Sequence, residues 1–416
     1  MKLSRIGRVS LAFVVSVAMG LGMTACGGGT IGFMWVLGTQ YNQIAGFKID
    51  DFTGNLTQVI HSPFASGGSN PVSLVVTPGG RYVYVVNKGS ASATAGSCGG
   101  ASGGITQFSV GGGGVLTFQQ CFTSQGFNPV WATRDSTGNY LFVLDSQAPA
   151  INGVLPPNGD ITVFSIAPDT GRLSLVLNQQ IKDPITGAQL TYFPVGKSPS
   201  MMQLAGGGCL LTLDKGDQTV FPYSVSGGQL VLTTNSTIPL NTTNATSINA
   251  NGSNVYITDA GTPNTPGQIL PYTIGNSCSL NTANGGAVAN LPFTSTPTYT
   301  MVNSKGTYLY VLNQSTTDSN AASYSSISAF TIDSTGKLQP LAGSALGNNP
   351  YKVGAGPVCM VEDPTNKYVY TSNSVDGTVS GFQLDDRSGQ LLNLTRGSTF
   401  TAVGQATCLA ISPNVQ

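Results

Sequence analysis

The chain is poor in charged residues. Of its 416 residues, 17 are Lys or Arg and 17 are Asp or Glu, so charged residues make up 8%, where about 25% is usual. A nucleic-acid-binding protein needs a dense Lys/Arg face to neutralise phosphates, and we therefore expect no nucleic-acid partner. The chain is not a disordered tail either, because 40% of its residues are hydrophobic and disorder goes with low hydrophobicity and high net charge.

Histidine, glutamate and helical periodicity are also scarce. The chain has one histidine, His61, and one glutamate, Glu362, and it contains no Cys-x-x-Cys pair. A histidine-rich zinc site is therefore excluded, and we expect no metal centre. Glycine (54 residues) and proline (23 residues) are abundant instead. This composition predicts many turns, few helices and an all-β fold.

The N-terminal segment predicts export. Three basic residues precede an apolar run of 13 residues, Leu11–Met23, which is too short to span a bilayer that needs about 20 helical residues. We therefore interpret residues 1–25 as a signal peptide. The small residues before Cys26 resemble a bacterial lipobox. This predicts a lipidated Cys26, a Gly-rich tether over residues 26–32, and membrane contact through the lipid anchor alone.

One pattern is repeated along the rest of the chain. Its clearest copy, residues 70–87, is a strand, a Pro-Gly-Gly turn and a second strand rich in β-branched and aromatic residues. A third strand, a Gly-rich hairpin and a fourth strand follow each copy. The same frame returns at residues 128–145, 199–214, 244–259, 297–313 and 357–373. A period of this kind indicates the blades of a β-propeller.

The seventh copy is split between the two ends of the chain. Phe33–Leu37 fits a second strand and Ala45–Ile49 a third strand, whereas the missing first strand is supplied by Thr407–Pro413. Pairing of the two ends would close the ring without an exposed sheet edge. The sequence thus predicts an all-β, seven-bladed propeller of four-stranded antiparallel blades over residues 33–416.

These repeats resemble a known family. The unit P-G-G-R-Y-V-Y-V-x-N at residues 78–87 and the run Gly38–Asp50 are similar to the seven-bladed propeller lactonases. Those are 6-phosphogluconolactonase-type enzymes, related to YVTN-repeat surface proteins and to a fungal muconate-lactonising enzyme. The resemblance implies a propeller and a lactone hydrolase. The repeats themselves specify the fold of the blades and do not identify catalytic residues.

Lactone hydrolysis needs a general base and a cation or donor for the oxyanion. Six Asn or Asp residues are expected to end the second strands and to face one side of the disc, where loops build a binding face: Asn87, Asp145, Asp214, Asp259, Asn313 and Asn373. A carboxylate of Asp145, Asp214 or Asp259 would serve as base. The alternative interpretation is that these residues cap turns through nearby backbone N–H groups.

Two other charged residues are weaker catalytic candidates. Glu362 and Arg134 share one frame position at the ends of first strands, but their contact would have to cross the channel. Otherwise they are solvated strand-end charges. We interpret His61 as a turn residue. The segment Asp214–Asp217 is the densest acidic cluster, but it lacks the ligand series of a calcium loop. We expect no cofactor, with a structural cation as the remaining alternative.

The cysteines indicate an oxidising location. Seven cysteines less Cys26 leave six, an even number typical of disulfides in exported proteins. The pairs that share a blade or lie on adjacent blades in the predicted frame are Cys98–Cys121, Cys359–Cys408 and Cys209–Cys278.

Two classes of function remain open. The first is a lactonase-like hydrolase that opens a lactone ester with carboxylate-activated water. A phosphorylated sugar lactone is a poor candidate, because that substrate is cytoplasmic and no Arg/Lys phosphate clamp is evident. The second is a non-catalytic binding or scaffold propeller that contacts glycans or envelope proteins. In both cases we expect an exported monomer, lipid-anchored in the bacterial cell envelope, periplasmic or on the outer surface.

Overall fold

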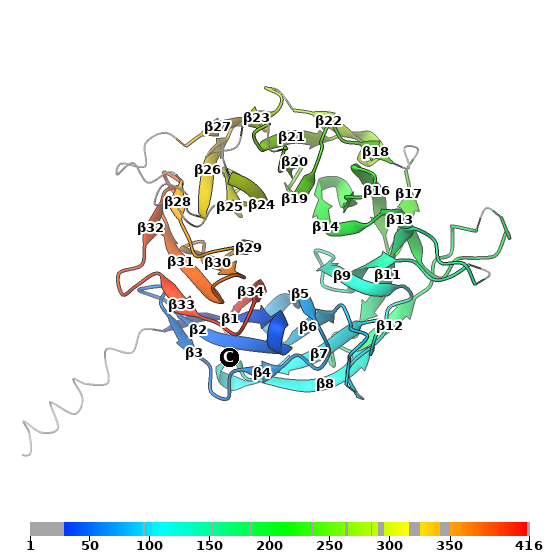
Figure 1. The fold of residues 1–416 in the computed structure, drawn as a ribbon, viewed down its shortest axis with the longest axis horizontal. Coiled ribbons are helices and arrows are strands. Elements are labelled where there is room, and N and C mark those ends of the chain that lie inside the picture. Colours follow the sequence, from blue (N-terminus) through cyan, green and yellow to red (C-terminus); the bar gives the residue numbers. More distant parts are fainter. Residues whose placement is uncertain are drawn as a thin grey trace, which may run out of the picture.

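The protein is a seven-bladed propeller. The computed structural model describes residues 29–413, except 95, 152, 184, 234–236, 263–264, 284, 290–294, 316–324 and 342–349. The predicted signal peptide and Cys26 lie outside the described residues. Seven antiparallel sheets surround a central axis (Figure 1), which confirms the predicted fold. No helix within the described part of the chain is long and apolar enough to cross a membrane.

Each blade has four principal strands, counted outwards from the axis. The first strands are β34 (Ala406–Pro413), β5 (Pro71–Val76), β9 (Phe127–Arg134), β14 (Pro199–Ala205), β19 (Ala245–Asn251), β24 (Ser295–Val302) and β29 (Pro357–Glu362). The second strands are β1 (Thr30–Gly38), β6 (Tyr82–Asn87), β10 (Tyr140–Gln147), β15 (Cys209–Asp214), β20 (Asn254–Asp259), β25 (Tyr308–Ser315) and β30 (Tyr368–Asn373). We number the blades one to seven in this order.

The outer strands follow in the same order of blades. The third strands are β2 (Gln43–Asp50), β7 (Gly104–Val110), β11 (Asn158–Ile166), β16 (Thr219–Ser226), β21 (Gln268–Ile274), β26 (Ser326–Ile332) and β31 (Thr378–Leu384). The fourth strands are β3 (Leu56–Gln58), β8 (Leu116–Phe122), β12 (Leu173–Val176), β17 (Gln229–Leu232), β22 (Leu280–Thr282), β27 (Leu338–Pro340) and β32 (Leu391–Asn393).

Short elements complete the blades. Short strands pair with the third strands of six blades: β4 (Phe64–Ala65), β13 (Phe193–Lys197), β18 (Ile238–Pro239), β23 (Val288–Ala289), β28 (Tyr351–Lys352) and β33 (Thr399–Thr401). Single 3-10 turns are η1 (Thr39–Tyr41), η2 (Pro78–Gly80), η3 (Gly112–Gly114), η4 (Gly206–Gly208) and η5 (Asn276–Cys278).

The C-terminal strand closes the ring. β34 pairs with β1 in antiparallel register, with Trp35 opposite Ala410 and Val36 opposite Leu409. β34 also contacts β29 of blade seven and β5 of blade two. The predicted closure is thus confirmed, and blade one contains both ends of the propeller.

The second strands form the centre of each interface between blades. Their residues are buried almost throughout, as in β6 and β30, because neighbouring blades cover both faces of each sheet. A strand that is covered on both faces reads as a continuous hydrophobic run rather than an alternating one. This accounts for the Val- and Tyr-rich second strands of the repeat.

Aromatic residues of the second strands of blades one, two, five, six and seven also tie each of these blades to the next. The Tyr84 hydroxyl donates to the carbonyl of Gly171 in blade three at 2.5 Å, and Tyr370 donates to Gly54 of blade one at 2.6 Å. Tyr256 and Tyr310 make the same bond to the following hairpin, and the indole of Trp35 does so from blade one. The hairpin glycines are therefore part of the contact between blades.

Candidate functional site

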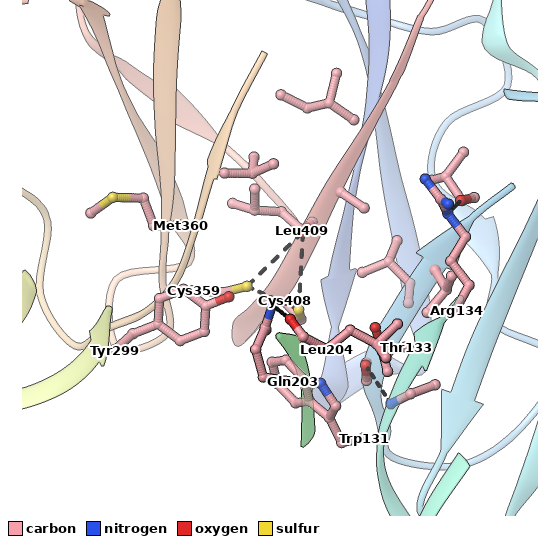
Figure 2. A pocket seen from close by; sticks show the side chains of 18 of the residues that line it. Trp131, Thr133, Arg134, Gln203, Leu204, Tyr299, Cys359, Met360, Cys408 and Leu409 are labelled. Atoms are coloured by element: carbon pink, nitrogen blue, oxygen red, sulfur yellow. Dashed lines mark hydrogen bonds between the residues drawn. The ribbon is translucent and has the colours of Figure 1, made fainter. Parts of the chain in front are cut away.

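A pocket of about 490 Å³ lies on the axis (Figure 2). The first strands β5, β9, β14, β24, β29 and β34 line it. It reaches Asp135 and Ser136, in the turn that follows β9. The pocket therefore opens toward the face of the propeller where first strands turn into second strands.

Two aromatic rings meet across the axis at the inner end of this pocket. Trp131 of blade three and Tyr299 of blade six have ring centroids 6.5 Å apart at 38°. Both rings are half-buried and line the pocket. They narrow the channel and give the pocket an aromatic base. The sequence does not predict this pair, because the two residues lie 168 positions apart and share only their position within the repeat.

Arg134 provides a positive charge on the pocket wall. Its Nε donates to the carbonyl of Val76 at 3.0 Å, and its Nη1 donates to the carbonyl of Asp135 at 3.2 Å. Burial lowers the pKa of the guanidinium, but an arginine stays protonated. Within the described part of the chain Nη2 makes no hydrogen bond, so it is left to bind a ligand.

The carboxylate of Asp135 lines the same pocket but is engaged in its own turn. It accepts the backbone N–H of Tyr140 at 2.8 Å and that of Thr137 at 3.3 Å. Asp363 binds its own turn in the same way, accepting the N–H of Tyr368 at 2.6 Å. This recurrence indicates a structural role for Asp135.

Glu362 and Arg134 occupy equivalent strand ends, as predicted, but they do not form a pair. The Glu362 carboxylate accepts the backbone N–H of Ser304 at 2.6 Å and the Ser304 hydroxyl at 3.4 Å. Burial raises the pKa of Glu362. The ion pairs among the described residues are Lys197–Asp217 and Lys305–Asp386. Glu362 thus joins blade six to blade seven rather than reaching across the channel.

The predicted ring of Asn and Asp residues lies at the opposite face and is buried. All six side chains are at most 2% exposed, and none lines the axial pocket. Asp145 and Asn313 precede the ends of their strands by two residues. The amides of three of them donate to hydroxyls of the third strands: Asn87 to Thr106, Asn313 to Ser328 and Asn373 to Ser380. These side-chain bonds lock the second strand to the third, whereas Asp259 accepts the backbone N–H groups of Asn244 and Gly261, as in the turn-capping alternative.

The three aspartates of the ring differ in the pKa of their carboxyl groups. Burial raises the pKa of Asp145 to about 7 and that of Asp214 to about 7. Burial also acts to raise the pKa of Asp259. Hydrogen bonds from the backbone N–H groups of Gly261, Asn244 and Thr243 outweigh this effect, and the pKa is lowered. A base must reach the water that it activates. Asp145 and Asp214 are sealed inside their blades, so their geometry does not fit the predicted catalytic role.

Asp259 and Asp214 have further neighbours on that face. Asp259 lines a separate pocket of about 420 Å³ together with Thr243 and Gln268.

In the predicted acidic cluster, Asp217 pairs with Lys197 at 3.5 Å while Asp214 points into the blade, where the Thr212 hydroxyl binds it. The cluster is therefore not a cation site. Among the described residues no three His, Cys, Asp or Glu side chains gather as a metal centre. His61 lies exposed in a turn with φ 64°, as predicted.

Two of the three predicted disulfides are present. Cys98–Cys121 lies within blade two and Cys209–Cys278 joins blades four and five, each with Cα atoms 5.6 Å apart. Cys359 and Cys408 are free thiols in this structure, and the predicted third disulfide is not formed. Their Sγ atoms are nevertheless 2.9 Å apart at the wall of the axial pocket, beside Tyr299 (Figure 2).

We expect a mild oxidant to convert this pair into a disulfide between blades seven and one. The contact with Cys408 lowers the pKa of Cys359. The Cys359 thiolate would attack glutathione disulfide and release one glutathione thiol, after which Cys408 would displace the second. Alkylation of the denatured mature chain should label both cysteines before oxidation and neither afterwards. In the Cys359→Ser variant Cys408 should form no intramolecular bond. Two labelled cysteines after oxidation of the wild type would contradict the prediction.

The fold and the pocket define the class of protein: a seven-bladed β-propeller with a ligand-sized cavity on its axis. Residues 254–407 match the family described as lactonase, 7-bladed beta-propeller. The resemblance seen in the repeats is thus confirmed over this part of the chain. No curated protein sequence matches the chain.

Solved structures extend the similarity to the whole propeller. A candidate 6-phosphogluconolactonase of Bacteroides fragilis is 17% identical, with a TM-score of 0.66 over 92% of this chain and 98% of that one. The periplasmic gluconolactonase of Pseudomonas aeruginosa is 19% identical, with a TM-score of 0.65 over 93% of this chain and 100% of that one. At these identities the likeness establishes the fold.

Proposed function

We propose that the chain is an exported propeller whose axial pocket binds a small, uncharged cyclic ligand of the sugar-lactone class. The observation that carries this proposal is the pairing of an aromatic base with a cationic wall. The Trp131 and Tyr299 rings offer flat faces for the apolar side of a sugar ring, and Nη2 of Arg134 can donate to a carbonyl oxygen. The volume of about 490 Å³ suits a small molecule.

The similarity to a periplasmic gluconolactonase supports both the lactone class and the export. Lactone hydrolysis is the second candidate function, and it is favoured by the match to the lactonase family. In that case Arg134 would stabilise the oxyanion of the opening lactone. The buried Asp145 and Asp214 would take no part, because they lie outside the pocket. The remaining alternative is contact with glycans. A polar pocket of about 300 Å³ between blades one and two supports this alternative.

Binding to the axial pocket can be followed by fluorescence, because the chain has two tryptophans. Trp35 is fully buried, whereas Trp131 lines the pocket. We expect sugar lactones to change the emission of Trp131 and to shield it from iodide. Trp131→Phe removes the reporter, so the binding of this variant is followed by titration calorimetry, and it should be weaker than that of the wild type. Arg134→Gln should weaken binding about tenfold or more, because a charged hydrogen bond contributes about 1.5–3 kcal/mol.

The matched control is Arg172→Gln, since Arg172 is exposed and lies outside the pocket. It should bind as the wild type does. The same lactone panel, followed in a pH-stat, tests for turnover. Binding that is indifferent to both Trp131→Phe and Arg134→Gln would rule out the axial pocket. Turnover that is abolished by Asp214→Asn, in a variant that still folds, would restore the ring carboxylates as candidates.

We also propose that the mature chain is anchored to the cell envelope through Cys26, which rests on the N-terminal sequence alone. A lipidated chain should partition into the detergent phase, and Cys26→Ser should move it to the aqueous phase. Mass spectrometry of an N-terminal peptide that begins at another residue, or that carries an unmodified Cys26, would exclude the anchor.

A further inference from the structure

Two carboxyl groups face each other inside blade three. Asp145 on β10 and Asp160 on β11 are directly opposite in the strand register, so their side chains lie on the same face of the sheet. Both residues are fully buried. Asp145 accepts the Ser124 hydroxyl at 2.7 Å and the Thr162 hydroxyl at 3.1 Å. Neither carboxyl oxygen of Asp160 has a partner at good hydrogen-bond geometry among the described residues, although the nearby Thr162 hydroxyl acts to lower the pKa that burial raises.

Among the described residues no cationic side chain forms an ion pair with these two carboxyl groups. The two ion pairs among the described residues, Lys197–Asp217 and Lys305–Asp386, involve other aspartates. Tyr192 and Tyr223 lie near enough for the charge of Asp160 to act on their pKa. Burial raises the pKa of both hydroxyl groups, so both tyrosines are neutral. An unpaired carboxylate inside a protein is costly. The pair must therefore hold either a proton or a cation.

The surroundings supply further oxygen atoms. The segment Ser124–Gly126 lies directly on the two carboxyl groups: a Cβ atom on Gly126 would stand 2.1 Å from Oδ1 of Asp160 and 2.6 Å from the carbonyl oxygen of Gln147. The main chain at Gly126 therefore packs directly against the two aspartates and the Gln147 carbonyl, and no larger residue fits there. A single shared proton would satisfy one oxygen of Asp160 and leave the other without a partner, whereas a cation with several ligands satisfies both.

We propose that Asp145 and Asp160, together with the main-chain oxygen of Gln147, bind a calcium ion. The donors are all oxygen atoms, which hard cations prefer, and paired carboxylates suit the flexible, high coordination of Ca²⁺. Mg²⁺ keeps several of its waters in proteins, and this fully buried site has little room for them. Main-chain and hydroxyl oxygens supply here what a third acidic side chain supplies in a conventional calcium loop.

The test compares melting temperatures of the mature chain in EGTA with those at about 1 mM Ca²⁺, a concentration at which extracellular calcium modules are filled. We expect Ca²⁺ to raise the melting temperature of the wild type more than Mg²⁺ does, and titration calorimetry to give one Ca²⁺ per chain. Asp160→Asn should bind at least about tenfold more weakly and lose the Ca²⁺ response. Asp214→Asn is the matched control, because Asp214 is an equally buried ring carboxyl without a second aspartate opposite it, and it should respond as the wild type does.

A wild-type melting temperature that does not change with Ca²⁺ would overturn the proposal, and a rise on acidification that persists in Asp214→Asn would assign a shared proton to the pair. An equal Ca²⁺ response in Asp160→Asn would overturn it as well, since the ion would then bind elsewhere. If Asp160→Asn does not fold, calorimetry on the wild type decides: absence of a single Ca²⁺ equivalent contradicts the site.

Discussion

The free energy of unfolding should fall as the pH rises from about 4 to about 7, and Asp214 should account for a distinct part of that fall. Burial raises the pKa of the folded-state carboxyl to about 7 from an ordinary value of 3.8. Between these values the folded chain holds a proton that the unfolded chain has released. Stability is therefore lost with rising pH, by up to about 1.4 kcal/mol per pH unit, and levels off above the folded-state pKa.

The Asp214→Asn variant isolates this contribution. An asparagine cannot ionise, and its amide can still accept the Thr212 hydroxyl, which binds both carboxyl oxygens at 3.1 Å. The free energies of unfolding of wild type and variant are measured by urea denaturation in EGTA. As the pH rises from about 4 to about 7, the wild type should lose several kcal/mol of stability relative to the variant. A difference that stays constant with pH would show that Asp214 is not protonated in the folded chain.

Removal of the closing strand should abolish the folded state. A chain that ends at Val403 lacks β34, so β1 loses its pairing partner and Trp35 and Val36 lose their cover. Blades two and seven would also lose the strand that separates them at the axis. We expect an insoluble chain or one without cooperative unfolding, measured by near-ultraviolet circular dichroism and urea denaturation.

A point substitution gives the same test in milder form. Leu409 is 4% exposed and packs in the core shared by blades seven, one and two. Leu409→Ala should lower the free energy of unfolding by about 2–5 kcal/mol. The control Val375→Ala, at a side chain that is 65% exposed, should change it by no more than about 0.5 kcal/mol. An unchanged urea midpoint in the truncated chain would contradict the role assigned to β34.

The sequence predicts the propeller well because each blade carries its own local signals. The Pro-Gly-Gly turn at residues 78–80 and the hairpin glycines mark strand ends wherever they occur. The split blade follows from counting, since only Thr407–Pro413 matches the missing first strand. Two disulfides could be predicted because the repeat places each pair of cysteines on one blade or on adjacent blades.

The binding face was harder to predict. An aspartate at a strand end, such as Asp145, looks the same in sequence whether it faces solvent or a buried threonine. Trp131 and Tyr299 meet across the axis, and no local pattern reports a contact between blades three and six. Asp160 was missed because Asn158–Asp160 reads as the end of a loop, whereas it begins β11. These features depend on how the blades lie against one another.

The bonds from second-strand aromatic residues to hairpin glycines all run in one direction around the ring. Trp35 of blade one reaches Gly114 of blade two, and Tyr370 of blade seven returns to Gly54 of blade one. The blade that holds the natural termini is therefore fastened to both of its neighbours in the same way as blades six and seven. The protein is therefore a suitable scaffold for circular permutation, with new ends opened in the loop between blades six and seven and the old ones joined by a linker.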